Sequence, residues 1–183
     1  ISLGSGLDGR YFRVSGFGRW TDVDYPDVIA LRRELMKGML TDRIILIGSS
    51  VTDSFWWDKM AADDGPVLIV MEGLLMYLHQ GEIETLFQAL LRKYPHCRLL
   101  FDAYSRMAAR GGRFQPNLRK AGAAVHWGMD APEEIECACH GLTFRRKMFL
   151  TEVREIPLLP RYYRFMFSMA GKWPVVREAH RIF

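Results

Sequence analysis

The feature that most constrains the fold is a series of five short apolar segments, each followed at once by glycine or an acidic residue. These segments cover residues 1–3, 20–23, 43–47, 67–71 and 98–101. Segments that are apolar throughout, rather than alternating with polar residues, are typical of parallel strands covered by helices on both faces. Helical patterns separate them, and this alternation predicts an α/β fold with a doubly wound, mostly parallel sheet.

Two helices are predicted from spacing and from proline. Residues 26–37 begin with Pro26, which is favoured in the first turn of a helix, and Val28, Leu31 and Leu35 recur at helical spacing. Residues 82–94 carry apolar side chains at the i, i+3, i+4 and i+7 positions before a proline ends the pattern.

The C-terminal third follows a different pattern. A helix is predicted over Glu133–Cys139, a long strand over Leu142–Leu150 and a last strand over Ala179–Phe183. A late antiparallel strand pair on a mostly parallel sheet accounts for this ending. Since no repeat and no Ser/Pro-rich linker interrupts the chain, we expect a single domain over residues 1–183.

The composition excludes several classes of protein. With 183 residues and 49% hydrophobic side chains, the chain can bury a full core, which excludes a disordered protein. No segment approaches the ~18 apolar residues of a membrane-spanning helix. The net charge of +4 lacks the dense basic face of a nucleic-acid binder. We therefore expect neither a membrane nor a nucleic acid as partner.

The three cysteines indicate a reducing compartment, because an odd number leaves one unpaired, and we expect a cytoplasmic protein. Cys137, Cys139 and His140 form a C-x-C-H group, but a zinc site needs a second pair of ligands at a known spacing. A helix here places these side chains on different faces. Small buried thiols are therefore expected, and no metal site.

The residues after the strands indicate what the protein binds, because ligands of open α/β sheets lie at the carboxyl ends of the strands. Gly4, Ser5 and Gly6 follow the first strand, and the glycines allow a sharp turn and a close approach to main-chain amides. A carboxylate after the second strand, Asp22 or Asp24, can accept two hydrogen bonds from ribose hydroxyls.

Two further strand ends extend this pattern. Ser50 and the amide of Val51 follow the third strand and can meet an adenine edge. Glu72 follows the fourth strand and can pair with a cationic group. The ordered set of small residues and carboxylates indicates a nucleoside ligand that carries a positive charge.

A second interpretation rests on the glycines themselves. Gly4 to Gly9 match G-x-G-x-x-G, and an acidic residue lies at about the expected distance downstream, as in a NAD-dependent oxidoreductase with a Rossmann fold. Such a site needs a helix that opens directly beneath the pyrophosphate. Here Gly9 is followed by the bulky, basic residues 10–13, which argues against this alternative.

Three motifs resemble one known family. Residues 3–13, L-G-S-G-L-D-G-R-Y-F-R, resemble the "L-G-x-G-L-D-T-R-x-x-R" opening of the leucine carboxyl methyltransferase family, which includes bacterial polyketide O-methyltransferases. Residues 22–29 resemble its "D-x-D-x-P-x-V-I" motif, and residues 72–78 are similar to its "E-G-x-L-M-Y-L" segment. The order and spacing of the motifs fit, and the resemblance covers roughly residues 1–105.

The resemblance implies a Rossmann-like class I methyltransferase that uses S-adenosylmethionine. The cofactor-binding residues that it implies are Gly4, Ser5, Gly6, Asp24, Ser50, Val51 and Glu72. The glycine segment would line the methionine and ribose parts, and Asp24 would hold the ribose hydroxyls. Ser50 and Val51 would face the adenine, and Glu72 would bind the ammonium group.

This chain departs from the family pattern in three ways. The family usually has Thr at the position of Gly9, so the third glycine of the dinucleotide match is accidental. It often has Asp at the position of Ser50, so the adenine contact here is expected to be weaker or rearranged. The family also carries a helical N-terminal segment that we expect this chain to lack, and an inactive methyltransferase-like fragment is therefore a third interpretation.

The expected reaction is O-methylation of a carboxylate or phenolic hydroxyl of a small, polyketide-like molecule. A carboxylate needs no base, whereas a phenol with a pKa near 10 benefits from one. His79, His126 and His140 are candidate bases, and none is assigned. Tyr104, after the fifth strand, is a candidate to face the acceptor.

The aromatic and Met-rich stretch Tyr162–Met169 has three possible uses. It can line an apolar acceptor pocket, pack in the core as a terminal helix, or form the surface of a homodimer.

Overall fold

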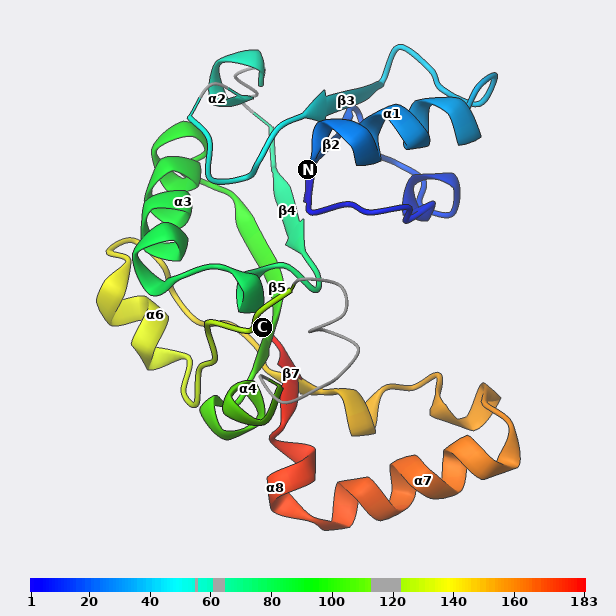
Figure 1. Cartoon of the computed structure of the whole chain (residues 1–183), viewed down its shortest axis with the longest axis vertical. Coiled ribbons are helices and arrows are strands. Elements are labelled where there is room, and N and C mark those ends of the chain that lie inside the picture. Colours follow the sequence, from blue (N-terminus) through cyan, green and yellow to red (C-terminus); the bar gives the residue numbers. More distant parts are fainter. Residues whose placement is uncertain (55, 61–64, 113–122) are drawn as a thin grey trace. The chain divides into compact units, whose positions relative to one another are not determined.

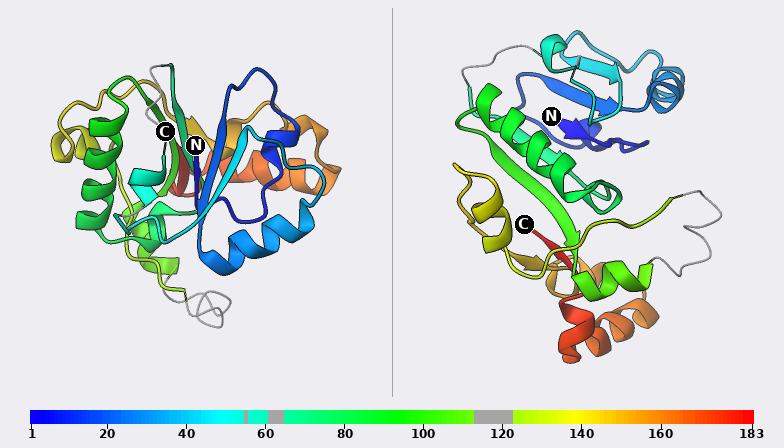
Figure 2. Two further views of the ribbon diagram at one scale, coloured as in Figure 1. Left: turned by 90° about the horizontal axis from the view of Figure 1, so that it is seen from above. Right: turned by 60° about the vertical axis from the view of Figure 1, so that its left-hand side comes forward.

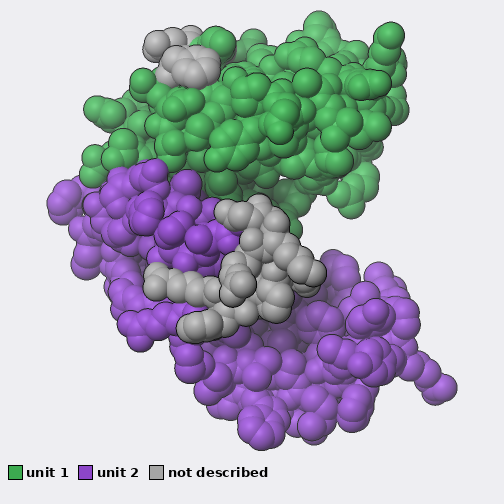
Figure 3. Space-filling view, in the orientation of Figure 1, with its two compact units in different colours: residues 1–74, 85–100 green, residues 75–84, 101–183 purple. Residues whose placement is uncertain are grey.

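The structure is a computed structural model that describes residues 1–54, 56–60, 65–112 and 123–183. The described residues gather into two compact units, coloured separately in Figure 3: residues 1–74 with 85–100 form unit 1, and residues 75–84 with 101–183 form unit 2. Each unit contains fully buried side chains, such as Leu3 in unit 1 and Met129 in unit 2. That the whole chain works as a single domain stays a prediction.

Among the described residues, seven strands form a mixed sheet in the order β3-β2-β1-β4-β5-β7-β6. The strands are β1 (Ser2–Leu3), β2 (Trp20–Asp24), β3 (Ile44–Gly48), β4 (Leu68–Met71), β5 (Arg98–Tyr104), β6 (Met148–Phe149) and β7 (His180–Ile182). β1 pairs in parallel with β2 and β4, and β2 pairs in parallel with β3. β7 runs antiparallel to both β5 and β6. The predicted α/β fold with a late antiparallel strand pair is confirmed.

The helices that the sequence predicted are also present. The α-helices are α1 (Pro26–Leu35), α2 (Trp56–Lys59), α3 (Gln80–Lys93), α4 (Arg106–Gly112), α6 (Glu133–Ala138), α7 (Arg161–Lys172) and α8 (Pro174–Arg177). Short 3-10 turns cover η1 (Arg10–Phe12), η2 (Leu75–Tyr77), η3 (Leu150–Glu152) and η4 (Ile156–Leu158). None of the helices in the described ranges is long and apolar enough to cross a membrane.

In unit 1, α1 runs alongside β2 and β3 (Figures 1 and 2) but buries a different face from the one that the leucine spacing suggested. Leu31 and Leu35 are 45% and 59% exposed, whereas Ile29, Arg32 and Met36 are buried. Arg32 forms an ion pair with Asp22 of β2, and both side chains are only 1% exposed. A buried carboxylate requires a paired cation, so this ion pair determines which face of α1 packs on the sheet.

In unit 2, the long strand predicted over Leu142–Leu150 is wrong for most of its length, since only Met148–Phe149 form β6. The backbone N–H of Phe144 donates to the Glu136 carboxylate instead of to a neighbouring strand. The charged residues that follow it, Arg145 and Arg146, are exposed. The segment therefore has neither the ladder partners nor the buried face that a strand needs.

The segment between β6 and β7 forms η3, η4, α7 and α8, drawn in orange and red in Figures 1 and 2. α7 has no buried residue, and Tyr162 and Phe165 are 69% and 66% exposed. The prediction that the stretch Tyr162–Met169 packs in the core is therefore wrong. An acceptor pocket and a homodimer surface stay predictions for it.

Candidate functional site

Four strand ends lie at one edge of unit 1. Since β1 to β4 pair in parallel, their carboxyl ends face the same way. The backbone N–H of Gly4 donates to the carbonyl of Val23 at 2.8 Å, and that of Ser49 donates to the carbonyl of Asp24 at 2.7 Å. The structure therefore brings the predicted residues of these strand ends to one edge; that they bind a cofactor stays a prediction.

The turn after β1 has the backbone shape that the glycines predicted. Gly4 and Gly6 have φ of 66° and 50°, in the left-handed region that favours glycine. A Cβ on Gly4 would lie 3.1 Å from Cδ1 of Leu74, whereas one on Gly6 would have no heavy atom within 4 Å. The backbone of Gly6 therefore faces open space, as the approach of a ligand requires.

Gly9 does not take part in this turn. Its φ is −95°, and the 3-10 turn η1 follows it rather than the first turn of an α-helix. A dinucleotide site needs that helix N-terminus for its pyrophosphate. The match of Gly9 to the third glycine of G-x-G-x-x-G thus has no structural counterpart.

A buried arginine that sequence reasoning did not assign holds the glycine turn from within unit 1. Nη1 of Arg32 donates to the carbonyl of Gly6 at 2.8 Å and to that of Asp8 at 2.9 Å, while Nη2 pairs with the carboxylate of Asp22. The indole N–H of Trp20 donates to the other oxygen of Asp22 at 2.8 Å. Burial raises the pKa of Asp22, and the charge of Arg32 opposes that rise.

The two carboxylates of β2 therefore have different roles. Asp22 is fully engaged in the interior, whereas Asp24 lies half-buried at the edge. The Asp24 oxygens accept backbone N–H groups of Gly6 and Tyr25, each at 2.7 Å. Each carboxylate oxygen has two lone-pair sites, so the fixed Asp24 can still accept two further hydrogen bonds.

The turn after β3 is closed by its own hydrogen bonds. The hydroxyl of Ser50 lies 2.8 Å from that of Thr52 and accepts the Thr52 N–H at 3.3 Å. Val51 is buried, and its carbonyl accepts the indole N–H of Trp56 at 3.2 Å. The adenine contact expected of Ser50 and Val51 stays a prediction.

Glu72, after β4, lies beside an arginine. Nη2 of Arg10 donates to Oε2 of Glu72 at 2.5 Å, and Nε of Arg10 lies 3.2 Å from a carboxylate oxygen of Asp8. The side chain of Glu72 is 68% exposed. The edge thus offers a negative and a positive group side by side. The pairing of β1 with β4 brings Arg10 and Glu72 together, and no sequence feature near either residue predicts that pairing.

Unit 2 holds a carboxylate–imidazole pair that sequence reasoning missed. His180 of β7 and Asp102 of β5 are joined by a hydrogen bond of 2.6 Å between Nε2 and Oδ2. The candidate bases named from the sequence are different residues: His79, His126 and His140 are exposed, and the rings of the first two are 4.2 Å apart.

The cysteines differ from one another in exposure. Cys139 is buried, as predicted, but Cys137 is exposed, so the prediction of buried thiols is wrong for it. Burial, and next the charge of Glu84, raise the pKa of the Cys139 thiol. The described residues contain no cluster of three histidine, cysteine or acidic side chains that could hold a metal ion.

Comparisons with known proteins identify the family. A model of leucine carboxyl methyltransferases matches residues 1–91. Over its whole length the chain is 32% identical to the tetracenomycin polyketide synthesis O-methyltransferase TcmP of Streptomyces glaucescens, and it covers 67% of that protein. The chain belongs to the leucine carboxyl methyltransferase family. This assignment replaces the dinucleotide-dependent oxidoreductase that the glycine pattern had left open.

Two further proteins are similar to this leucine carboxyl methyltransferase family member. The S-adenosyl-L-methionine-dependent methyltransferase dpfgK of Gibberella zeae is 33% identical over 162 residues, which are 82% of this chain and 54% of dpfgK. The N-methyltransferase NodS of Bradyrhizobium japonicum, solved with S-adenosyl-L-homocysteine, has a similar fold with a TM-score of 0.54 at 12% identity, over 99% of this chain and 73% of NodS. The chain spans about two thirds of TcmP and about half of dpfgK.

Proposed function

We propose that this protein is an S-adenosylmethionine-dependent O-methyltransferase that acts on a carboxylate or phenolic hydroxyl of a small, polyketide-like molecule. The observation that carries the proposal is the carboxylate of Asp24, held by two backbone N–H groups at the edge where the glycine turn and Glu72 also lie. Two relatives support it: TcmP is a polyketide O-methyltransferase, and dpfgK is an S-adenosyl-L-methionine-dependent methyltransferase.

The residues at this edge fit an adenosyl ligand. Beside the open space over Gly6, the hydroxyl of Ser5 is buried and has no hydrogen-bond partner among the described residues. Buried polar groups are normally paired, so an unpaired hydroxyl in the turn fits a site that takes a polar ligand. The remaining acceptor sites of Asp24 suit a pair of vicinal hydroxyls.

The charged pair beyond the turn suits the amino-acid end of the ligand. Glu72 would bind its ammonium group, and Arg10, 2.5 Å from Glu72, would offer the complementary charge to its carboxylate. Arg32 keeps the turn rigid from within the unit, because its guanidinium bonds two of the turn's carbonyls. Ser50 and Val51 would border the adenine.

The bound cofactor supplies an electrophilic methyl group, and the protein supplies position and shielding from water. A carboxylate acceptor is already a nucleophile at neutral pH, whereas a phenol gains from a base. The exposed apolar side chains of α7 are the part of unit 2 that we assign to the acceptor, and a homodimer formed through α7 is the second possibility. The three unpaired cysteines support a cytoplasmic protein.

Titration calorimetry tests the proposal. The protein should bind S-adenosylmethionine and not NAD, and Glu72→Gln should weaken that binding at least tenfold if the charge pairing is worth about 1.5–3 kcal/mol. A matched control is Glu82→Gln, because Glu82 belongs to unit 2, where it accepts the backbone N–H of His79. Binding of NAD instead of the methyl donor would overturn the proposal.

Transfer of a labelled methyl group is then measured over a panel of aromatic carboxylic acids and phenols. Methylated product from any member of the panel supports the proposed O-methyltransferase activity. Tight binding of the donor with no product over the whole panel would favour the inactive methyltransferase-like fragment.

A further inference from the structure

We infer that Arg32 is a positioning residue for the methyl donor, because it ties together the two ends of the proposed donor site. One end is the glycine turn with Asp24, for the ribose, and the other is Arg10 with Glu72, for the amino-acid group. This role rests on the proposed S-adenosylmethionine-dependent function and deepens it. All of these residues belong to unit 1.

The ion pair with Asp22 fixes the guanidinium of Arg32 in the interior of unit 1. Both side chains are only 1% exposed, and the indole N–H of Trp20 holds the other oxygen of Asp22 at 2.8 Å. A buried carboxylate without a cation is costly, so Asp22 keeps Arg32 in one place. Because a guanidinium is a rigid, planar fork, its remaining donors then point in a fixed direction.

That direction is toward the turn that follows β1. Nη1 of Arg32 donates to the carbonyls of Gly6 and Asp8, at 2.8 and 2.9 Å. The N–H of Gly6 donates to Oδ2 of Asp24 at 2.7 Å. Gly6 is therefore held at both its N–H and its carbonyl. Loss of the bond from Arg32 would let the N–H that orients Asp24 toward the ribose move.

The bond to Asp8 carries the same constraint to the amino-acid end. The N–H of Asp8 donates to the carbonyl of Ser5 at 3.1 Å, so both backbone groups of Asp8 are held. Its carboxylate lies 3.2 Å from Nε of Arg10, and Nη2 of Arg10 donates to Oε2 of Glu72 at 2.5 Å. The backbone position of Asp8 thus sets where the guanidinium of Arg10 lies beside Glu72.

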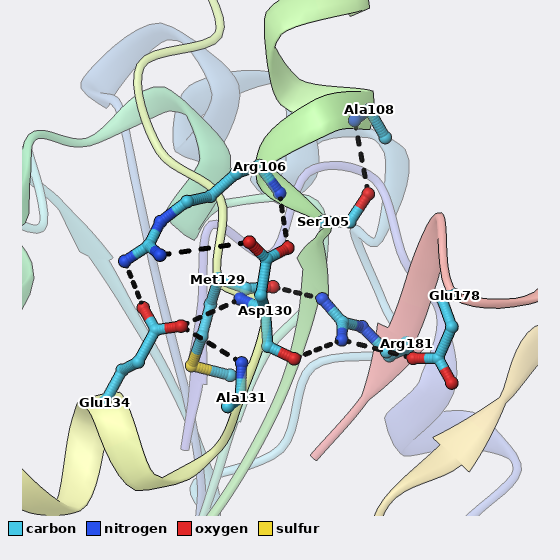
Figure 4. A network of polar contacts seen from close by, with 9 residues as sticks. All are labelled: Ser105, Arg106, Ala108, Met129, Asp130, Ala131, Glu134, Glu178 and Arg181. Atoms are coloured by element: carbon cyan, nitrogen blue, oxygen red, sulfur yellow. Dashed lines mark hydrogen bonds and ion pairs between the residues drawn. The ribbon is translucent and has the colours of Figure 1, made fainter. Parts of the chain in front are cut away.

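Unit 2 contains a second buried arginine that makes the same kind of bonds, shown in Figure 4. Arg181 is 2% exposed and donates to the carbonyls of Met129 and Asp130 and to the carboxylate of Glu178. None of these three partners is proposed to bind the donor. Arg181 is therefore the matched comparison for Arg32, since the two differ in the segment whose carbonyls they hold.

Replacing an arginine by lysine separates its charge from its fork. Arg32→Lys keeps a positive charge for Asp22, but a single ammonium nitrogen does not reproduce the planar set of donors. We therefore expect the variant to fold, with the bonds to the Gly6 and Asp8 carbonyls lost or distorted. Binding is measured at a temperature at which circular dichroism shows each variant to be folded.

The first test compares two ligands that reach different parts of the site. S-adenosylhomocysteine has both the ribose and the amino-acid group, whereas adenosine has the ribose alone. If each end loses about the worth of one hydrogen bond, Arg32→Lys should weaken adenosine about threefold and S-adenosylhomocysteine about tenfold. S-adenosylhomocysteine is titrated by calorimetry, and adenosine is measured by its competition with it. Unchanged affinities, or equal losses for the two ligands, would overturn the inference.

The second test asks whether Arg32 acts through the charged pair. Glu72→Gln should weaken S-adenosylhomocysteine about tenfold in the unchanged protein. In the Arg32→Lys background the same change should weaken it only about threefold, because Arg10 and Glu72 are no longer aligned and coupled residues are not additive. An equal effect of Glu72→Gln in both backgrounds is the additive result of independent sites and would refute the connection.

Asp8→Asn tests the connection with the Arg32 side chain intact, which also covers the case that Arg32→Lys does not fold. The variant keeps the carbonyl that Arg32 bonds but removes the negative charge beside Arg10. It should weaken S-adenosylhomocysteine about threefold and leave adenosine unchanged. A loss with both ligands, or with neither, would contradict the role given to Asp8 and overturn the inference.

Arg181→Lys is the matched control. It removes the same kind of fork from unit 2, so it should lower the midpoint of thermal unfolding and leave the affinity for S-adenosylhomocysteine unchanged. A loss of affinity equal to that of Arg32→Lys would indicate a general effect of destabilisation and overturn the inference alone. Failure of the unchanged protein to bind S-adenosylhomocysteine would instead overturn the proposed function, and this inference with it.

Discussion

Replacing Arg32 by methionine tests whether the buried ion pair holds the glycine turn. The substitution leaves Asp22 buried at 1% exposure without its cation, and frees the carbonyls of Gly6 and Asp8. Breaking a buried ion pair on one side costs about 3–5 kcal/mol. For a chain of 183 residues, at about 2–4 °C per kcal/mol, the midpoint of thermal unfolding should fall by roughly 6–20 °C.

Two control variants make this prediction refutable. Arg33→Met changes the next residue of α1, which is exposed and bonds one carbonyl of β3, and should cost less than about 1 kcal/mol. The double variant Arg32→Met with Asp22→Leu removes both charges and should recover most of the loss. A single variant as stable as the Arg33→Met protein, or a double variant less stable than the single one, would refute the reasoning.

Three further changes have expected results. Gly4→Ala imposes φ of 66° on an L-residue and brings a Cβ to 3.1 Å from Leu74, so it should cost about 1–2 kcal/mol in urea unfolding and weaken donor binding in calorimetry. Gly128→Ala places a Cβ 2.8 Å from that of Ala109 and should cost about 1–3 kcal/mol; a melting curve unchanged from the parent would contradict the packing. With a thiol reagent at pH 8, the exposed Cys137 should react at once, whereas Cys139, which is buried and has a raised pKa, should react only on unfolding. Equal reaction rates of the two thiols would contradict their different burial.

The strands β1, β3 and β4 were predictable because each is a short, mostly apolar run, as burial on both faces of a parallel sheet favours. β2 is less regular in composition, because it carries the buried Asp22. The placement of Gly4, Asp24 and Glu72 at one edge followed from strand direction alone.

The parts that were missed depend on partners distant in the chain. α1 buries Arg32 rather than Leu31 because Asp22, ten residues before Arg32, needs a counter-charge. The spacing of apolar residues carries no information about such an ion pair. The Asp102–His180 pair joins residues 78 positions apart and depends on the register of β7. β6 is short because the Glu136 carboxylate accepts the backbone N–H of Phe144, which a strand would have used for pairing. The composition of the segment does not reveal this hydrogen bond.

A crystal structure with S-adenosylhomocysteine bound would test the central claim most directly. The account predicts both ribose hydroxyls within about 3 Å of the Asp24 carboxylate, with the amino group beside Glu72 and the turn at Gly6 against the ligand. A ligand bound away from the carboxyl ends of β1, β2 and β4, or a ribose without contact to Asp24, would contradict it.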